Sequence, residues 1–296
     1  MATIAFIGLG NMGGGMAANL CNAGHSVRAF DLSEAAVSRA VDAGATAAAS
    51  IAAAVDGVDA VITMLPAGPH VLSVYFDADG VSAHAPSSAI LIDCSTIAVT
   101  DAREFVAQAE AAGFAAVDAP VSGGTAAADA GTLTFMVGGA DDAFAKAQPL
   151  LANMGANVFH AGAPGNGQVA KVANNMLLGI SMIATSEAFN LAEQLGLPAD
   201  KFFEISSKAS GQCWSMTSYC PAPGPVPASP ANRDYEPGFT VAMMLKDLNL
   251  ARDAATAAGA DTAFGEQARQ FYEALAEKGQ EGKDFSVAMR EIQSRN

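Results

Sequence analysis

Residues 3–16, TIAFIGLGNMGGGM, join a short apolar run to a cluster of glycines. The pattern G-x-G-x-x-G falls on Gly8, Gly10 and Gly13, directly after the apolar run and before a stretch of helical period. In such a turn the first glycine allows a tight bend, the second lets the backbone approach a pyrophosphate, and the third lets the helix pack closely on the strand. The stretch therefore predicts the start of a dinucleotide-binding domain. The loop supplies three further predicted cofactor contacts, Leu9, Asn11 and Met12.

The second predicted strand, SVRAFD at 26–31, ends in an acid, Asp31. A carboxylate at this place can accept hydrogen bonds from both hydroxyls of an adenosine ribose, and it repels a 2′-phosphate. The sequence therefore predicts NAD rather than NADP as the cofactor. An alternative role for Asp31 is to cap the helix that begins near Ser33, and the two roles are compatible.

Strand-like and helix-like segments alternate through the first half of the chain, which is typical of parallel strands joined by crossover helices. Further strand-like runs follow at 59–65, 89–95, 114–120, 133–139 and 157–162. We therefore expect an α/β Rossmann-type domain with a mostly parallel sheet over residues 1–163. After Gly167 the strand patterns stop, so residues 164–296 predict an all-α C-terminal domain, with a long helix near 166–195 that joins the two domains.

The stretch 220–238, CPAPGPVPASPANRDYEPG, is dense in proline and predicts a loop. Two interpretations stay open for it. It is either a rigid surface connection or a flap at an active site or a subunit contact.

Charge and cysteine usage exclude several classes of function. The chain has 296 residues and a formal net charge of −15, which repels nucleic acid and acidic membrane surfaces. Its four cysteines form no C-x-x-C pair, which favours reduced thiols and no metal site. The sequence has no apolar run of about 18 residues and no leader-like N-terminal pattern. We therefore expect a cytoplasmic protein, or a processed organellar one, with no nucleic-acid or membrane partner.

Five stretches, spread over nearly the whole chain, resemble the β-hydroxyacid dehydrogenase family. The first marks only a nucleotide-binding fold, whereas the second and third, in this order and spacing, are specific to the family. The fourth, with the proline-rich loop after it, resembles the branch that acts on hydroxyisobutyrate rather than the branch that acts on tartronate semialdehyde. The stretches are FIGLGNMGGGMAANL at 6–20, DAPVSGG at 118–124, GNGQVAKVANN at 165–175, SGQCWS at 210–215 and LKDLNLA at 245–251.

The resemblance implies a Rossmann domain, a long interdomain helix and a helical C-terminal domain. It also implies oxidation of a short β-hydroxy acid to its semialdehyde by hydride transfer to NAD, in a homodimer or homotetramer. Lys171 would be the catalytic residue and Lys246 would lie beside the nicotinamide. Leu65, Pro66 and Thr96 would contact the cofactor. One departure is Gln212, which stands where the family resemblance predicts an arginine.

Hydride transfer needs a protein group that can exchange a proton with the alcohol oxygen. The four histidines are poorly placed for this, and His70, near the end of a predicted strand, is the main rival. Lys171 fits better, because Gly167, Lys171 and Asn175 share one helix face, with Asn174 beside them. Asn175 can then orient the ammonium or bind the substrate, and Lys171 acts as acid/base or as a stabiliser of the alkoxide. The alternative is a solvated lysine on a helix face.

The apolar residues that follow Lys171 point largely to other angles of the same helix, and we expect them to be buried between the two domains. They are Met176, Leu177, Ile180 and Ile183.

A second glycine-containing turn predicts a cradle for the substrate carboxylate. Ser122 offers a hydroxyl, and Gly123 and Gly124 offer unobstructed backbone N–H groups. The alternative is an ordinary glycine turn at a strand end.

Four residues of the C-terminal half complete the predicted site. Trp214 and Tyr219 would form a wall of the substrate pocket, although core packing is an alternative for Trp214. Asp247 is assigned to the substrate and Lys246 to the cofactor, with a solvated helix face as the alternative for both. Because neighbouring residues on a helix do not face each other, the sequence does not imply an ion pair between these two.

Three functional alternatives stay open. A related dehydrogenase could act on tartronate semialdehyde, glycerate or L-serine by the same chemistry. A phosphogluconate enzyme fits less well, because its phosphate needs several cations. A protein of another class, an NAD-binding sensor or scaffold without turnover, is opposed by the Lys171 and Ser122 motifs.

Overall fold

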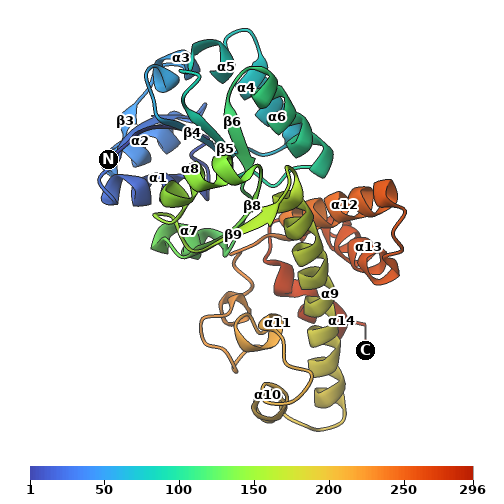
Figure 1. The fold of residues 1–296 in the computed structure, drawn as a ribbon. Helices are drawn as coiled ribbons and strands as arrows, with labels where there is room; N and C mark the ends of the chain where they lie inside the picture. The colour runs from blue at the N-terminus through green and yellow to red at the C-terminus, as the bar shows by residue number, and fades with distance from the viewer. Residues whose placement is uncertain (296) are drawn as a thin grey trace. The chain divides into compact units, whose positions relative to one another are not determined.

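The computed structural model describes residues 1–295 and separates into two compact units. The first unit is Met1–Lys171, and the second runs from Val172 onward. The boundary falls inside one long helix, α9 (Asn166–Gln194), so that its first turns belong to the first unit. Within residues 1–295, all strands lie in the first unit and the second unit is helical, as Figure 1 shows by the change from arrows to coils.

The first unit is built on one sheet, which has nine strands within the described residues. The order is β3-β2-β1-β4-β5-β6-β8-β7, with β9 paired to β8. Strands β1 to β6 pair in parallel, whereas β8 is antiparallel to β6 and β7, so the predicted mostly parallel sheet is confirmed. The strands are β1 (Thr3–Ile7), β2 (Ser26–Phe30), β3 (Thr46–Ala47), β4 (Ala60–Thr63), β5 (Ile90–Asp93), β6 (Ala115–Asp118), β7 (Val121–Ser122), β8 (Leu133–Gly138) and β9 (Gly155–Gly162).

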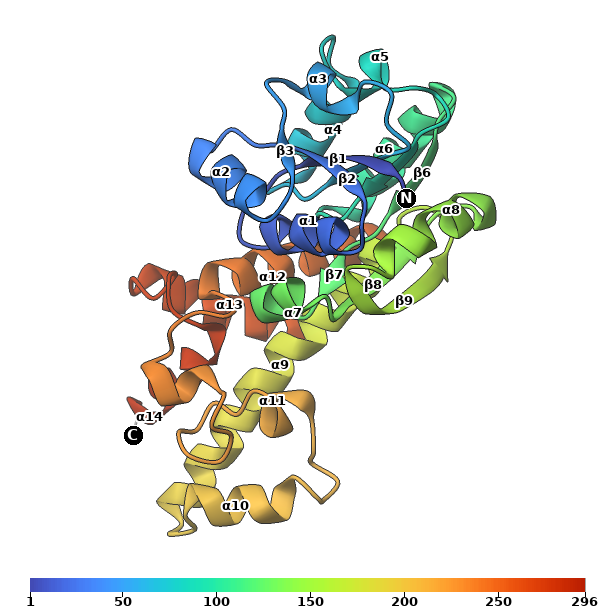
Figure 2. The same cartoon turned by 90° about the vertical axis from the view of Figure 1, so that its left-hand side faces the viewer.

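Helices cover both faces of this sheet, which is why its central strands are apolar throughout (Figure 2). In β1, Ile4 and Phe6 enter one core and Ala5 and Ile7 enter the other. The first core packs against α1 (Gly13–Asn22), α2 (Glu34–Asp42), α7 (Gly124–Ala130) and α8 (Asp141–Leu151). The second packs against α3 (Ile51–Val55), α4 (Gly68–Phe76), α5 (Val81–His84) and α6 (Val99–Ala111).

The second unit packs its helices around its own apolar core, in which Met182, Phe189, Met244, Tyr272 and Phe285 are buried. The helix α9 approaches α12 closely at Gly179, where an added Cβ would lie 3.1 Å from the Met244 sulfur. The remaining elements are α10 (Ala199–Ser206), α11 (Trp214–Thr217), η1 (Pro230–Arg233), α12 (Val241–Ala258), α13 (Ala263–Glu277), η2 (Phe285–Val287) and α14 (Ala288–Gln293).

The proline-rich stretch 220–238 is irregular apart from the single turn η1, as predicted for a loop. Two buried hydrogen bonds join distant parts of this stretch. The Ser229 hydroxyl donates to the Cys220 carbonyl, and the Tyr235 hydroxyl donates to the Pro221 carbonyl at 2.9 Å.

One expectation about α9 is wrong. Met176, Ile180 and Ile183 pack against the core of the second unit, but the side chain of Leu177 is 62% exposed. Leu177 lies on the solvent-exposed face of the helix. We expected it to be buried because its side chain is apolar, but apolar character alone does not determine which face of a helix is buried. Among residues 1–295, no helix combines the length and apolar character needed to cross a membrane.

Candidate active site

In the turn after β1, some glycines are required by the fold itself, and another leaves space that a ligand could occupy. Gly8 has a φ of +95°, and an added Cβ would lie 2.3 Å from the Met64 carbonyl oxygen. At Gly13 a Cβ would lie 2.0 Å from the Gly8 carbonyl oxygen. At Gly10, in contrast, a Cβ would meet no atom within 4 Å. The chain itself therefore requires the first and third glycines, whereas open space at Gly10 fits the close approach of a cofactor pyrophosphate.

Asp31 is held in place at the end of β2 by two backbone groups. Its Oδ2 accepts from the Leu9 N–H at 2.6 Å, and its Oδ1 accepts from the Ser33 N–H at 2.7 Å. Ser33, not Asp31, is the N-cap of α2, because its hydroxyl accepts from the Ala36 N–H. Each carboxylate oxygen has a second lone pair, so the group can still accept hydrogen bonds from ribose hydroxyls.

A hollow of about 530 Å³ lies beside Asp31. Its described lining includes a second carboxylate, Glu34, and neither lysine nor arginine. Such a lining disfavours an additional phosphate group on the ribose. The lining residues are Phe30, Asp31, Glu34, Val37, Ser38, Val41, Ala47, Ala48 and Ala49.

Three polar residues lie side by side where neighbouring strands end, since Thr63 of β4 pairs in register with Asp93 of β5, and Asp93 with Asp118 of β6. The Asp93 Oδ1 accepts from the Thr63 hydroxyl at 2.7 Å and from the Ser95 hydroxyl at 2.6 Å. Ser95 in turn accepts from the Leu65 N–H at 2.8 Å. This network fixes two loops that carry predicted cofactor contacts, Leu65 and Pro66 in one and Thr96 in the other.

Burial strongly affects Asp93, which has no exposed surface. Desolvation raises its pKa from 3.8 to about 6, although the hydrogen bonds from Ser95 and Thr63 counteract the rise. Within the described residues, its second oxygen, Oδ2, has no hydrogen-bond partner.

Asp118 attaches the first turn of α9 to the same edge of the sheet. Its Oδ1 accepts from the Gly165 N–H at 2.7 Å, and its Oδ2 accepts from the Gln168 N–H at 3.0 Å. Burial raises the pKa of Asp118, and the backbone N–H groups counteract that rise. Lys171 follows one turn later in the first unit, and its side chain is 7% exposed. The turn that carries the predicted catalytic lysine is therefore anchored where the strands of the cofactor domain end.

One turn beyond Lys171, Asn175 is oriented from two sides. Its Oδ1 accepts from the Asn174 amide at 2.9 Å, and its own amide donates to Oδ2 of Asp247 on α12. Asn175 and Asp247 are 2% and 4% exposed, whereas Lys246 is half-buried. Asp247 thus orients Asn175, and the amide of Asn175 has a second hydrogen for a ligand.

The predicted carboxylate cradle lies between β7 and α7. Ser122 ends β7, Gly123 has a φ of +138° and Gly124 a φ of +70°. At Gly123 an added Cβ would lie 2.5 Å from the Ala127 Cβ, so both conformation and space favour glycine there.

Trp214 and Tyr219 are stacked, with ring centroids 4.9 Å apart. The Tyr219 hydroxyl donates to the buried Asp284 at 2.8 Å, and burial together with this carboxylate raises the pKa of Tyr219. The Trp214 side chain is 50% exposed. The Tyr219 ring therefore packs against one face of the Trp214 ring. Its hydroxyl group already donates its hydrogen to Asp284. Gln212 is exposed and donates to the Thr217 hydroxyl at 3.4 Å.

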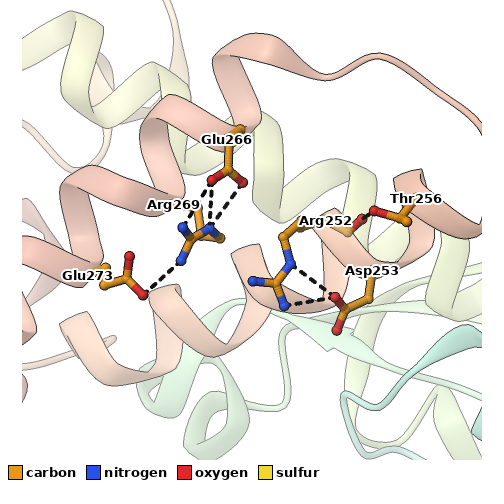
Figure 3. Close-up of polar contacts among 6 residues, drawn as sticks. All are labelled: Arg252, Asp253, Thr256, Glu266, Arg269 and Glu273. Atoms are coloured by element: carbon orange, nitrogen blue, oxygen red, sulfur yellow. Dashed lines mark hydrogen bonds and ion pairs between the residues drawn. The ribbon is translucent and has the colours of Figure 1, made fainter.

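A second hollow, of about 340 Å³, lies in the helical unit between α12 and α13, and its charged lining residues are one cation, Arg252, and two acids, Asp261 and Glu266. Figure 3 shows that Arg252 donates to Asp253, and that Arg269 bonds both Glu266 and Glu273. A hollow with such lining is a poor site for a carboxylate. Among residues 1–295, the structure brings together no group of three acidic, histidine or cysteine side chains that could hold a metal ion.

Three buried residues of this site were not predicted from the sequence: Asp93, Asp118 and Gln168. The first two had a detectable signal, because an acid that ends an apolar strand, as in ILID and AAVD, is rarely placed there without a partner. The rival candidate His70 is exposed on α4.

Comparison with known proteins matches both halves of the chain to nicotinamide-dependent dehydrogenases. Residues 3–162 match a family described as the NAD binding domain of 6-phosphogluconate dehydrogenase. Residues 165–292 match a family described as NAD-binding of NADP-dependent 3-hydroxyisobutyrate dehydrogenase.

Similarity also extends over the full length. The chain is 50% identical over 290 residues to an NAD-dependent L-serine dehydrogenase of Pseudomonas aeruginosa, covering 98% of this chain and 97% of the relative. It is 48% identical over 295 residues to a probable 3-hydroxyisobutyrate dehydrogenase of Mycobacterium tuberculosis, covering 100% and 99%. A solved structure of the Mycobacterium tuberculosis 3-hydroxyisobutyrate dehydrogenase with L-serine matches with a TM-score of 0.94 and 48% identity, over 99% of each chain.

Proposed function

The chain belongs to the 3-hydroxyisobutyrate dehydrogenase family of β-hydroxyacid dehydrogenases, and we propose that it oxidises 3-hydroxyisobutyrate to methylmalonate semialdehyde with NAD, a step of valine degradation. The observation that carries the proposal is the attachment of the Lys171 turn, through Asp118, to the edge where the strands of the cofactor domain end.

Lys171 is the group that we assign to the alcohol oxygen. NAD, when bound, accepts the hydride, and the chain must hold the substrate and manage the proton. As a neutral amine Lys171 would take the proton, and as an ammonium it would stabilise the developing alkoxide. Its small exposed fraction, 7%, strengthens either interaction because little water screens it.

The substrate carboxylate is assigned to the Ser122 hydroxyl and to the backbone N–H groups of Gly123 and Gly124. Asn175 is assigned a hydrogen bond to the substrate through its remaining amide hydrogen, with Asp247 fixing the amide. Trp214, supported by Tyr219, offers an apolar ring surface.

NAD is proposed over NADP because Asp31 and Glu34 both lie at the hollow where a 2′-phosphate would need a cation. The predicted cofactor contacts at Leu65, Pro66, Thr96 and Lys246 remain part of this proposal. Three of them, Leu65, Pro66 and Thr96, belong to the loops that the Asp93 network holds.

L-serine is the second candidate substrate, because one relative is described as an NAD-dependent L-serine dehydrogenase and a related structure contains L-serine. L-serine carries an ammonium group at the α carbon, where 3-hydroxyisobutyrate carries a methyl group. A methyl group favours an apolar wall such as Trp214, whereas an ammonium needs acceptors. Glycerate and tartronate semialdehyde remain the further alternatives.

We also propose a homodimer or homotetramer in the cytoplasm. Two leucines on the outer face of α9, Leu177 and Leu191, are 62% and 61% exposed, and an association surface would bury them.

The test is a spectrophotometric panel of 3-hydroxyisobutyrate, L-serine and glycerate with NAD and NADP. We expect 3-hydroxyisobutyrate with NAD to give the highest kcat/KM. Lys171→Ala should lower kcat at least about 1,000-fold, within the range typical for loss of an acid/base group, while the Kd for NADH changes less than about 3-fold.

The matched control is Lys146→Ala, which removes an exposed lysine of α8 and should keep wild-type rates. Lys171→Arg retains the charge but cannot release a proton at ordinary pH, so activity in this variant would favour electrostatic stabilisation. Full turnover by Lys171→Ala would contradict the assignment. A protein that binds NADH but oxidises no member of the panel would point to the sensor alternative.

A further inference from the structure

The backbone N–H and both polar atoms of the Gln168 side chain form hydrogen bonds within the first unit, and the residue has no exposed surface. Its backbone N–H donates to Asp118, its Nε2 donates to the Ser95 carbonyl at 2.7 Å, and its Oε1 accepts from the Ile97 N–H at 3.2 Å. The side-chain amide therefore holds the backbone on both sides of Thr96. Ser95 and Ile97 are themselves buried, so neither backbone group can turn to water instead.

This amide joins two parts of the predicted catalytic machinery. The loop at 95–97 follows β5 and contains Thr96, a predicted cofactor contact. The first turn of α9 contains Gln168 and leads to Lys171, less than one turn further along. A shift of this turn relative to the loop would change the separation between the lysine and the reacting carbon.

Each part also has an anchor of its own. Asp118 fixes the start of α9 through Gly165 and the Gln168 backbone. The loop is fixed by Ser95, which bonds Asp93 and Leu65. The Gln168 side chain is thus needed for neither part to form, and its specific contribution is their relative position.

We propose that Gln168 is a positioning residue for hydride transfer, which sets the Lys171 turn against the cofactor-contacting loop at 95–97. The role rests on the proposed function of Lys171. Because rates fall steeply when reacting groups are displaced by about 1 Å, loss of the bridge should act on kcat rather than on binding.

The test compares Gln168→Met, which keeps length and apolar volume but neither hydrogen bond, with the wild-type protein. We expect kcat with the best β-hydroxy acid to fall at least about 10-fold, with KM and the Kd for NADH changed less than about 3-fold. The deuterium isotope effect on kcat, with substrate labelled at the alcohol carbon, should rise as hydride transfer becomes rate-limiting. In the ligand-free protein, the Ile97 amide should exchange with deuterium faster than in the wild type.

Asn19→Leu is the matched control, because Asn19 also bridges two elements of this unit, donating from α1 to the Ala128 carbonyl at 2.7 Å. It should lower stability without changing the isotope effect. If Gln168→Met does not fold, Gln168→Leu carries the same expectation, because it also lacks both the acceptor for Ile97 and the donor to Ser95.

An active wild type together with an unimpaired kcat in the folded Gln168 variant would overturn the positioning role and leave the proposed function intact. Unchanged exchange at Ile97 would also overturn it. A wild-type protein that oxidises no β-hydroxy acid would overturn the proposed function, and with it this role.

Discussion

Asp93 is a carboxyl group whose burial makes it sensitive to pH. In the folded protein its pKa is about 6, against 3.8 for the ordinary value, so the folded state keeps a proton that the unfolded chain has already lost. The stabilising effect of that proton is fully present below pH 3.8, falls as the pH rises, and is lost above about pH 6. Above that pH the fold holds a buried charge.

We therefore predict that Asp93→Asn stabilises the protein at neutral pH. The asparagine keeps the oxygen that accepts from Thr63 and Ser95, and its amide replaces the oxygen that has no partner among the described residues. From pH 5 to pH 7.5, the difference in unfolding free energy between variant and wild type should increase in favour of the variant by about 1 kcal/mol. Urea denaturation at both pH values measures it. A difference that does not change with pH would mean that Asp93 does not titrate in this range.

In the turn between β1 and α1, substitutions of two glycines should have different effects. Gly13→Ala should destabilise the fold by about 1–3 kcal/mol, because its Cβ would overlap the Gly8 carbonyl. Gly10→Ala should change stability by less than about 1 kcal/mol, because the position is open, yet weaken NADH binding at least about 10-fold.

Thermal unfolding and NADH fluorescence titration separate the two effects. If Gly10→Ala bound NADH normally, the cofactor pyrophosphate would not approach this loop in the way that we infer.

The helix α9 shows what local pattern can and cannot predict. The helix predicted at 166–195 is observed at Asn166–Gln194, since small and apolar residues continue without a break. The contacts that place it were not predictable, because Asp118 and Gln168 are 50 residues apart in sequence and Ser95 and Gln168 are 73 apart. Helical period carries no information on such pairs.

For the whole molecule, the fold class and the family followed from the sequence, and both are confirmed. The two-residue strands β3 and β7 were missed, because two residues show no periodicity. The assignment of catalytic and binding residues remains a prediction. What the structure adds to it is the set of buried acids that hold Asn175, the first turn of α9 and the cofactor loops.

Association of two chains is also testable. If the exposed leucines of α9 lie at a subunit contact, Leu191→Glu should introduce a charge there and shift the protein toward monomers, while Phe159→Glu, at an exposed site on β9, should not. Sedimentation velocity at micromolar concentration measures the change. A wild type that sediments as a monomer would contradict the homodimer or homotetramer.

The boundary between the two units falls between Lys171 and Val172, inside a helix that also carries Asn175. Consider a chimaera with the sheet-containing half of one relative and the helical half of another. If the crossover followed this boundary, Lys171 and Asn175 would come from different parents. Crossovers placed before Gly165 or after Asn175 keep both residues from one parent. Recombination of this chain with its relatives should thus yield active hybrids only when this one helical segment is inherited as a block.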